Sequence, residues 1–416
     1  MFSKPLRYLA LLFLLLLPAL AHAAFTRPKI MIAPPTQMPN FVLQQPDHTN
    51  LRYYVVDPPA DEQPKGVMLF IHGLGEYALR HEPLIRQIAE AAHVRVVSFD
   101  LRGHGYTQQS NLGVVYGKFP RGLVSDVTTS PRAPPMRLGD VGSFATLMED
   151  CTAVLAAGMR GLPADLPTMV FGHSLGGLIA LVFSTYAPPA HLRATIASAP
   201  ALDSPSRPMA PTIYAAKALR FFGLDSIAID NGLESSGLSR DPAVAASYEQ
   251  DPMVHSYVSL RTGLFIFEEG DRLLLNADHQ ARLAEPAQDP IFDVAKSRLF
   301  ILHGDGDAIT SQPASLRFVS ALSAVARGTP REPGAPPVAS LDLDPAGTAS
   351  LPAYLQPHED LIFSGASPSA IPGSGTFSPD AEAILATYRG AYHELSQDLI
   401  KEDFISRVVA YTMSVI

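Results

Sequence analysis

Short runs of apolar residues recur along the chain, and glycine, proline or polar residues bound each of them. Such runs are typical of β-strands, and continuous ones such as residues 66–71 are typical of strands buried on both faces of a parallel sheet. The runs that we expect to form strands are residues 51–56, 66–71, 94–99, 168–171, 194–198, 298–302 and 383–388. Residues 24–50 are proline-rich and show no period, so we expect an irregular segment there.

Between these runs, apolar residues recur at the spacing of three to four positions that is typical of helices packed on a core. The segments that we expect to be helical are residues 83–93, 141–159, 178–186, 311–326 and 396–413. Strands that alternate with helices, with glycine-containing loops at the strand ends, predict a parallel sheet with βαβ crossovers. The predicted fold class is therefore α/β.

Three segments interrupt this alternation. Residues 106–138 contain prolines and serines and predict a long loop. Residues 203–297 contain helix-like stretches but no convincing strand, so we expect a mainly helical cap inserted before the next strand. Residues 327–379 are rich in Pro, Gly, Ser and Ala, and they cannot bury enough surface to offset their ordering entropy, which predicts disorder or a loose surface excursion. The α/β core would then comprise residues 24–202 and 298–416.

The composition suits a large globular protein that does not bind nucleic acid. Of the 416 residues, 47% are hydrophobic, which is enough for one large α/β domain with insertions or for two ordinary domains. The formal net charge is −9, and no run of basic residues follows the N-terminus. Binding to a phosphate backbone needs clustered Lys and Arg, so we expect no nucleic-acid partner.

The first 23 residues have the order of a secretory signal peptide. Lys4 and Arg7 precede an apolar stretch at residues 9–17, and Ala21-His22-Ala23 follows it. This order predicts cleavage after Ala23 and export to the periplasm or the exterior. The stretch is shorter than the about 20 residues of a comfortable membrane span, but neighbouring alanines extend it, so an uncleaved membrane anchor is the alternative.

Cys151 is the single cysteine, which rules out an intramolecular disulfide. Apolar residues surround it at helical spacing in FATLMEDCTAVLAAGM. We therefore expect a buried thiol on a helix rather than a nucleophile.

The stretch PTMVFGHSLGGLIALVFSTYAP, residues 167–188, joins a strand-like run, a glycine turn and a helix-compatible run. Its centre reads G-x-S-x-G, with Ser174 between Gly172 and Gly176. A strand, turn and helix of this kind form the nucleophile elbow of α/β hydrolases, which exposes a serine hydroxyl at a sharp bend. Glycines suit the flanking positions because the chain segments around the bend pass too close for a Cβ. A purely structural turn is the alternative, since so short a motif recurs by chance.

A serine hydroxyl needs a base that a third group orients, and on this fold the chain order is serine, acid, histidine. Catalytic groups gather at the carboxyl ends of the strands, so the acid should follow a strand beyond the elbow. Asp307 lies in the loop after residues 298–302, and Asp305 in the same loop is its competitor. Only His358 and His393 come later in the chain. His358 falls in the expected excursion, so His393, between the last strand and the final helix, is the predicted base.

Two backbone N–H groups are candidates for the oxyanion hole. One belongs to Leu175, the residue after the serine, and the other should come from the loop after an earlier strand. The glycine-rich sequence of residues 72–75 makes Leu74 the candidate for the second donor, with a plain turn at the strand end as the alternative.

Several of these motifs resemble those of one known family. The segments HGLGEYALRH, FDLRGHG, GHSLGG, SRDPAVAASYEQDPMVH, HGDGD and YRGAYHEL are similar to the monoglyceride lipase and lysophospholipase branch of the α/β hydrolases, a serine aminopeptidase-like hydrolase family. The resemblance implies the α/β-hydrolase fold, with a mostly parallel central sheet flanked by helices. It implies Ser174, Asp307 and His393 as the catalytic triad and Leu74 with Leu175 as the oxyanion donors.

The same resemblance implies that Glu76 and Arg80 form a structural pair. We expect His72, His104 and Asp251 to be structural as well. The loops and the insertion depart from the family's pattern, and since such segments shape a pocket, the acyl-chain and head-group preference stays open.

The expected function is that of a serine ester hydrolase acting on a small amphiphilic ester of the monoacylglycerol or lysophospholipid type, without a metal ion or cofactor. The cap segment at residues 212–224 could guide such an amphiphile and contact a membrane, or could pack on the sheet. A serine aminopeptidase is the main alternative, because related enzymes cleave peptides. It would need acidic cap residues for the substrate amine, and the candidates are Glu234, Glu249, Glu268 and Glu269. A non-catalytic binding module is a further alternative, although such proteins usually lack a triad member.

Overall fold

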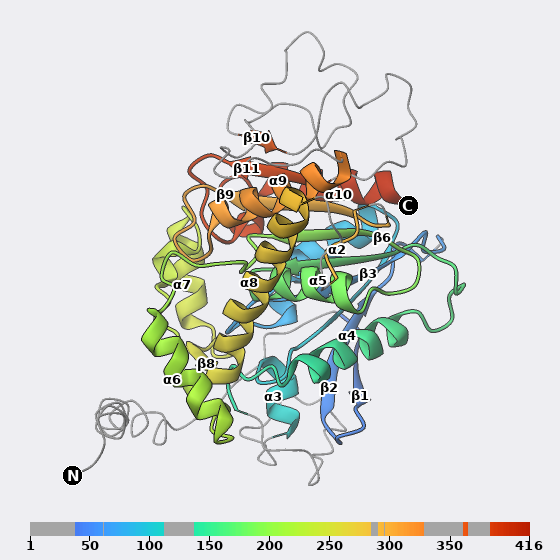
Figure 1. Cartoon of the computed structure of the whole chain (residues 1–416). Helices are drawn as coiled ribbons and strands as arrows, with labels where there is room; N and C mark the ends of the chain where they lie inside the picture. Colours follow the sequence, from blue (N-terminus) through green and yellow to red (C-terminus); the bar gives the residue numbers. More distant parts are fainter. Residues whose placement is uncertain are drawn as a thin grey trace, which may run out of the picture.

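A mostly parallel sheet forms the centre of this computed structural model, which describes residues 38–60, 62–111, 137–283, 290–294, 296–327, 361–364 and 383–416 (Figure 1). Within these ranges the sheet has nine strands in the order β1-β2-β4-β3-β5-β6-β9-β11-β10. Neighbouring strands from β4 to β11 run parallel, whereas β1, β2 and β10 are antiparallel to their neighbours. The strands are β1 (Asn40–Gln44), β2 (Asn50–Val56), β3 (Val67–Ile71), β4 (Arg95–Phe99), β5 (Thr168–His173), β6 (Leu192–Ser198), β9 (Arg298–Gly304), β10 (Leu361–Ser364) and β11 (Ala383–Tyr388). The predicted fold class is confirmed.

Helices cover both faces of this sheet, which explains the continuous apolar strands. Every residue of β3 and of β5 is buried. On one face, Leu69 of β3 joins a core cluster with helices α4 (Phe144–Gly158), α5 (Leu175–Tyr186), α8 (Leu260–Leu283) and α9 (Gln312–Arg327). On the other face, its neighbour Phe70 joins a second cluster with α2 (Glu82–Ala91) and α10 (Lys401–Val415). Alternate side chains of one strand thus enter two separate cores, as the pleat of a strand requires.

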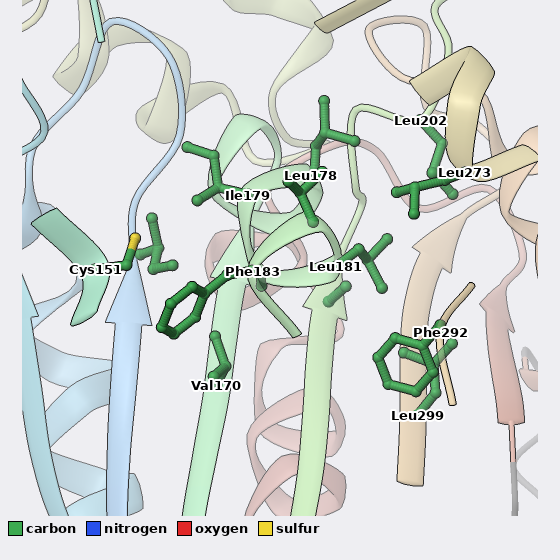
Figure 2. Close-up of a cluster of buried hydrophobic side chains, with 14 of the residues drawn as sticks. Cys151, Val170, Leu178, Ile179, Leu181, Phe183, Leu202, Leu273, Phe292 and Leu299 are labelled. Carbon is green, nitrogen blue, oxygen red and sulfur yellow. The ribbon is translucent and has the colours of Figure 1, made fainter. Parts of the chain in front are cut away.

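The larger core cluster is built around α5, the helix that follows the predicted elbow. Figure 2 shows Leu178, Leu181 and Phe183 of α5 together with Val170 of β5 and Leu273 of α8. Cys151 belongs to the same cluster and is fully buried on α4, so the prediction of a buried helix thiol is confirmed. Burial raises the pKa of this thiol well above its ordinary value and keeps it protonated.

The segment predicted as a cap contains α6 (Ala210–Phe221), the short helix η2 (Ser235–Gly237), α7 (Pro242–Gln250) and α8. Helices α6 and α7 lie together beside the sheet (left in Figure 1). The expectation of a segment without strands is wrong, because β7 (Ala228–Asp230) pairs antiparallel with β8 (Tyr257–Ser259). Such three-residue strands carry too short a pattern to be recognised in a sequence. Helix α8 also packs against α5 and α9, so its later turns belong to the core.

Three further segments differ from the expectation. Strand β1 lies in the segment predicted to be irregular, and β10 lies within the predicted surface excursion, where it pairs with β11. Helix α3 (Gly105–Asn111) occupies the start of the predicted long loop. Residues 1–37, 112–136, 328–360 and 365–382 lie outside the described residues, so the signal peptide and the remainder of both loops stay predictions. No helix in the described ranges is long and apolar enough to cross a membrane.

Close backbone packing surrounds the turn between β5 and α5. A Cβ on Gly172 would overlap the carbonyl oxygen of Gly176, and a Cβ on Gly176 would overlap the carbonyl oxygens of Ile71 and His72. The obstacles are backbone atoms of packed elements, which cannot rotate away as a side chain can. Both glycines are required by space, as the sequence predicted.

We therefore predict that Gly176→Ala prevents folding or lowers the melting temperature sharply, since overpacking a rigid site costs about 1–3 kcal/mol or more. Gly263, on α8, is the matched control, because an added Cβ there meets nothing within 4 Å. Replacing it with Ala should leave stability unchanged or raise it by about 0.5–1 kcal/mol through helix propensity. Thermal unfolding followed by circular dichroism measures both. Equal melting temperatures for the two variants would contradict the packing argument.

Candidate active site

Ser174 occupies the bend between β5 and α5 in a conformation that few non-glycine residues adopt. Its φ is 55° and its ψ is −117°, in the left-handed half of backbone space. The bend is held by main-chain hydrogen bonds, since Ser174 N–H donates to Ser198 O (2.9 Å) and Ser174 O accepts from Ala201 N–H (3.0 Å). Backbone strain of this kind persists only where the surroundings enforce it, and it is concentrated at functional sites. The serine side chain is only partly buried and can be reached from outside.

The structure brings the three predicted triad residues into one hydrogen-bonded chain. The distance from His393 Nε2 to Ser174 Oγ is 2.8 Å, and His393 Nδ1 lies 2.7 Å from Asp307 Oδ2. His393 lies in the loop between β11 and the short helix η6 (Leu395–Gln397), and Asp307 lies in the loop after β9. This geometry lets the imidazole accept the serine proton while the carboxylate orients the ring.

Asp307 accepts more hydrogen bonds than orientation of a histidine alone requires. Its Oδ1 accepts from the N–H groups of Ile309 (2.8 Å) and Thr310 (3.0 Å). Its Oδ2 accepts from the Thr310 hydroxyl (2.8 Å) and lies 3.2 Å from His303 Nε2. The side chain has no exposed surface. Sequence reasoning missed Thr310 and His303, although both lie within four residues of the predicted acid.

Asp305, the competing candidate for the catalytic acid, contacts the main chain and not the imidazole. It is exposed, and its Oδ1 accepts the N–H of Gly390 at 2.5 Å. Gly390 has a φ of +65° and forms the turn after β11 that leads to His393. Asp305 therefore stabilises a turn, and among the two aspartates only Asp307 contacts the imidazole.

Burial and neighbouring charges shift the pKa values of Asp307 and His393 in opposite directions. Burial alone would raise the pKa of Asp307, but the charge of His393 and hydrogen bonds from His303 and His393 hold that pKa well below its ordinary value. Burial alone would lower the pKa of His393, but the charge of Asp307 and its hydrogen bond raise it above 6.5. Asp307 thus stays ionised and stabilises the imidazolium that forms when the serine gives up its proton.

The two predicted oxyanion donors belong to segments that adjoin the serine. Leu175 is the first residue of α5, so its N–H has no carbonyl partner within the helix. The loop after β3 runs against the serine, because a Cβ on Gly73 would come within 3.1 Å of Ser174 Cβ. Leu74 follows in this loop, half-buried, with its side chain packed against the core. Its role as the second donor stays a prediction.

Three further histidines near the site, His72, His104 and His255, pack together in the interior. The rings of His72 and His104 lie 5.3 Å apart, and that of His255, from the cap, lies 4.9 Å from His104. Burial lowers the pKa of His72 to about 3 and that of His104 to about 4. Within the described residues no group of His, Cys, Asp and Glu side chains has the arrangement of a metal site. The structural role expected for His72 and His104 agrees with this setting.

A strained serine on a strand–helix turn, joined to a histidine and a buried aspartate, defines the protein as an α/β hydrolase in fold and site. The chain matches the profile of the family described as serine aminopeptidase, S33 (Hydrolase_4), over residues 62–327. That match covers more than half of the chain, so the protein belongs to this family.

Its relatives include monoglyceride lipases. The chain is 28% identical over 195 residues to the monoacylglycerol lipase of Mycolicibacterium smegmatis, covering 47% of this chain and 58% of the relative. It is 25% identical over 213 residues to the monoglyceride lipase of Rattus norvegicus, covering 50% and 59%. Another relative is an uncharacterised abhydrolase domain-containing protein of Dictyostelium discoideum, 26% identical over 62% of this chain and 22% of its own length. The chain therefore matches less than two thirds of the length of each of these relatives.

Solved structures confirm the fold. A soluble variant of monoglyceride lipase from Saccharomyces cerevisiae, in complex with a substrate analog, aligns with a TM-score of 0.57 at 20% identity, covering 93% of this chain and 97% of the other. A monoacylglycerol lipase from Paleococcus ferrophilus aligns with a TM-score of 0.55 at 21% identity, covering 88% and 99%. Together with the family match, these similarities support the predicted resemblance to the monoglyceride lipase branch.

We predict that Asp307→Asn lowers kcat by about 10⁴, as the equivalent change does in other serine triads. In the unaltered protein, activity on a p-nitrophenyl ester should fall as the pH drops through a value above 6.5, because protonated His393 cannot accept the serine proton. In the variant, the acidic limb of the residual activity should move to lower pH, because the charge that raises the pKa of His393 is gone.

Asp305→Asn is the control for this prediction, since an amide oxygen can still accept the Gly390 N–H. It should retain activity within a few-fold and keep the acidic limb in place. Profiles of kcat/KM between pH 5 and pH 9, with thermal unfolding of both variants, make the comparison. A large loss in Asp305→Asn with an active Asp307→Asn would reverse the assignment.

Proposed function

We propose that the protein is a carboxylic-ester hydrolase that cleaves small amphiphilic esters of the monoacylglycerol or lysophospholipid type through an acyl-enzyme on Ser174. The observation that carries this proposal is the hydrogen-bonded chain from Asp307 through His393 to a strained, accessible serine. The monoglyceride lipases among its relatives support an ester as the substrate class.

The reaction follows from the positions of these groups. His393 Nε2 takes the proton from Ser174 Oγ as the oxygen bonds to the acyl carbon, and the N–H groups of Leu74 and Leu175 stabilise the oxyanion. The imidazolium then gives its proton to the alcohol oxygen as the ester C–O bond breaks. Water, deprotonated by His393, attacks the acyl-enzyme, and the fatty acid leaves as Ser174 regains its proton. Asp307 holds the Nδ1–H tautomer throughout.

Two of the four acidic cap residues that a peptidase could use are already paired with cations. Glu268 pairs with Arg220 at 2.6 Å and with Lys217 at 3.2 Å. Glu269 pairs with Arg272 at 3.2 Å, and Glu249 accepts the hydroxyl of Ser235 at 2.5 Å. Glu234, the remaining candidate, is exposed and precedes η2.

An aminopeptidase needs a carboxylate that is held for the substrate amine. Pairs with cap cations already neutralise Glu268 and Glu269, so neither offers an uncompensated charge to an incoming ammonium group. Among these candidates, Glu234 and Glu249 are left for a substrate amine, and the family that the chain matches is described as serine aminopeptidase. We therefore keep the peptidase as the second candidate function.

The cap also offers a surface suited to an amphiphilic substrate. Helix α6 has no buried residue, which speaks against the alternative that this segment packs on the sheet. Phe221 and Phe222 are 85% and 65% exposed, and their rings form a T-shaped pair with centroids 5.4 Å apart. Met209 and Tyr214 are exposed on the same segment. We propose that these residues contact the lipid aggregate from which the substrate is taken.

The substrate class is tested with 1-monoacylglycerol, lysophosphatidylcholine and a proline anilide. We expect hydrolysis of at least one lipid ester and none of the anilide. Ser174→Ala should abolish ester hydrolysis, lowering kcat by about 10⁴–10⁶ as triad removals do elsewhere. Covalent labelling of Ser174 by a fluorophosphonate, followed by mass spectrometry, reports the nucleophile independently of the substrate. Cleavage of the anilide alone would replace the ester hydrolase with the peptidase.

The lipid contact is tested with the double change Phe221→Ser and Phe222→Ser. Removing two exposed phenyl rings should lower the rate on monoacylglycerol in phosphatidylcholine vesicles by about tenfold or more, since burying one Phe side chain is worth about 1.5–3 kcal/mol. The rate on a short, soluble ester should not change. Leu399→Ser, at a side chain that is 68% exposed outside the cap, is the matched control. Equal losses on both substrates would exclude a role in lipid contact.

A further inference from the structure

Two buried carboxylates and one guanidinium form a network beside the proposed triad. Arg80 lies between Glu76 and Glu394, and the three side chains are 6%, 3% and 3% exposed. Arg80 Nε donates to Glu76 Oε2 at 3.2 Å, and Arg80 Nη2 lies 2.7 Å from both oxygens of Glu394. The pair of Glu76 and Arg80 was expected from the sequence, whereas Glu394 was not.

Glu76 holds the loop that carries the proposed oxyanion donor. Its Oε1 accepts the N–H of Gly73 at 2.6 Å and lies 2.9 Å from His81 Nε2. Gly73 directly precedes Leu74 and lies against Ser174. The position of the peptide that offers the Leu74 N–H therefore depends on the Glu76 carboxylate.

Glu394 holds the other side of the site, because it follows His393 directly in the chain. Its own N–H donates to Leu238 O in the cap at 2.7 Å. The guanidinium of Arg80 also lies over the ring of Tyr248, from α7, at 4.8 Å from the centroid. Arg80 thus contacts the oxyanion loop, the histidine loop and the cap through one planar group.

Stability alone does not account for this arrangement. Burying ions costs several kcal/mol each, and a buried ion pair is often no more stabilising than apolar packing of the same shape. Here three ionisable side chains are buried together, so this cost applies to each of them. A fork of N–H donors with fixed geometry can, however, set the distance between two segments, which a flexible ammonium cannot do.

We propose that Arg80 is a positioning residue, whose guanidinium joins Glu76 to Glu394 and so keeps the oxyanion loop in register with His393. This inference rests on the proposed hydrolase function and adds a residue that touches neither the substrate nor the reacting atoms. Its consequence is that stabilisation of the transition state depends on Arg80 more strongly than binding of the substrate does.

Charged groups near His393 also affect the pKa of its imidazole. Besides Asp307 and the Ser174 hydroxyl, the ring of His393 faces the Thr310 hydroxyl at 3.3 Å and the His173 ring at 4.9 Å in the described part of the chain. After burial and the contribution of Asp307, the charges of Glu394 and Glu76 also raise the pKa of His393. Loss of the Glu394 charge should therefore make His393 easier to deprotonate.

The test compares Arg80→Lys with Arg102→Lys. Arg102 is the matched control, because it is 7% exposed and also bridges two carboxylates, Asp150 at 2.6 Å and Asp47 at 2.5 Å, in contacts that involve no triad residue. We expect kcat of Arg80→Lys to fall about 10- to 100-fold with little change in KM, since a misplacement of about 1 Å can cost ~10² in rate. Arg102→Lys should lose thermal stability but keep its kcat.

Inhibitors separate positioning from a general loss of structure. A trifluoromethyl ketone analogue of the ester mimics the oxyanion, and the corresponding non-hydrolysable ether mimics only the bound substrate. In Arg80→Lys, the Kd of the ketone should rise by the same factor by which kcat/KM falls, whereas the Kd of the ether should stay constant. Equal weakening of both inhibitors, or an activity loss equal to the unfolded fraction, would overturn the proposal.

Glu394→Gln provides a second variant if Arg80→Lys does not fold. It keeps the shape of the side chain but removes the charge, so kcat should fall and the acidic limb of kcat/KM should shift to lower pH. An unchanged kcat and an unchanged limb would refute the role of the network. Fluorophosphonate labelling of the unaltered protein distinguishes failure of the proposed function from failure of this inference. If Ser174 is not labelled, the hydrolase function itself is wrong. If Ser174 is labelled but the Arg80 and Glu394 variants are fully active, only the positioning role is wrong.

Discussion

The close approach of three backbone segments at the serine turn is the constraint on which the rest of the site depends. Strand β3 pairs with β5 so that Ile71 lies opposite Gly172, and Gly176 of α5 lies against the carbonyl groups of Ile71 and His72. The loop after β3 therefore begins at the level of the bend and has to pass beside Ser174. No side chain fits between these segments, so the distance from the serine to the proposed oxyanion loop is fixed by the main chain.

Strand register places the other two triad residues in the same way. Strand β11 runs parallel to β9 with Tyr388 opposite Gly304, so the loops that carry His393 and Asp307 leave the sheet side by side. The turn that leads to His393 is held by the Asp305 carboxylate at Gly390. Burial would favour uncharged forms of both Asp307 and His393, but their mutual attraction and the hydrogen bonds to Asp307 outweigh it. The parallel sheet thus provides the proximity, and the buried contacts provide the ionisation state.

Sequence patterns predicted those parts of the structure that local chemistry determines. Continuous apolar runs identified the central strands, and the required order of serine, acid and histidine selected residues that the fold brings into contact. Strands β1 and β10 were missed because their apolar runs are only three residues long and lie within segments whose composition predicts irregular structure. Strands β7 and β8 are too short to show a period. Contacts between distant segments, such as that of Arg80 with Glu394, 314 positions later, have no local pattern at all.

The cap is connected to the catalytic loops through main-chain bonds as well as through side chains. His255 N–H donates to Gly75 O at 2.9 Å beside the oxyanion loop, and Glu394 N–H donates to Leu238 O beside the histidine loop. A Cβ on Gly75 would overlap the carbonyl oxygen of His255, so the two backbone segments are closely packed at this contact. Two segments of the cap, at Leu238 and at His255, are therefore bonded to the loops beside the serine. A displacement of these anchoring segments of the cap has to move at least one of the two loops, because neither contact has a flexible side chain to absorb it.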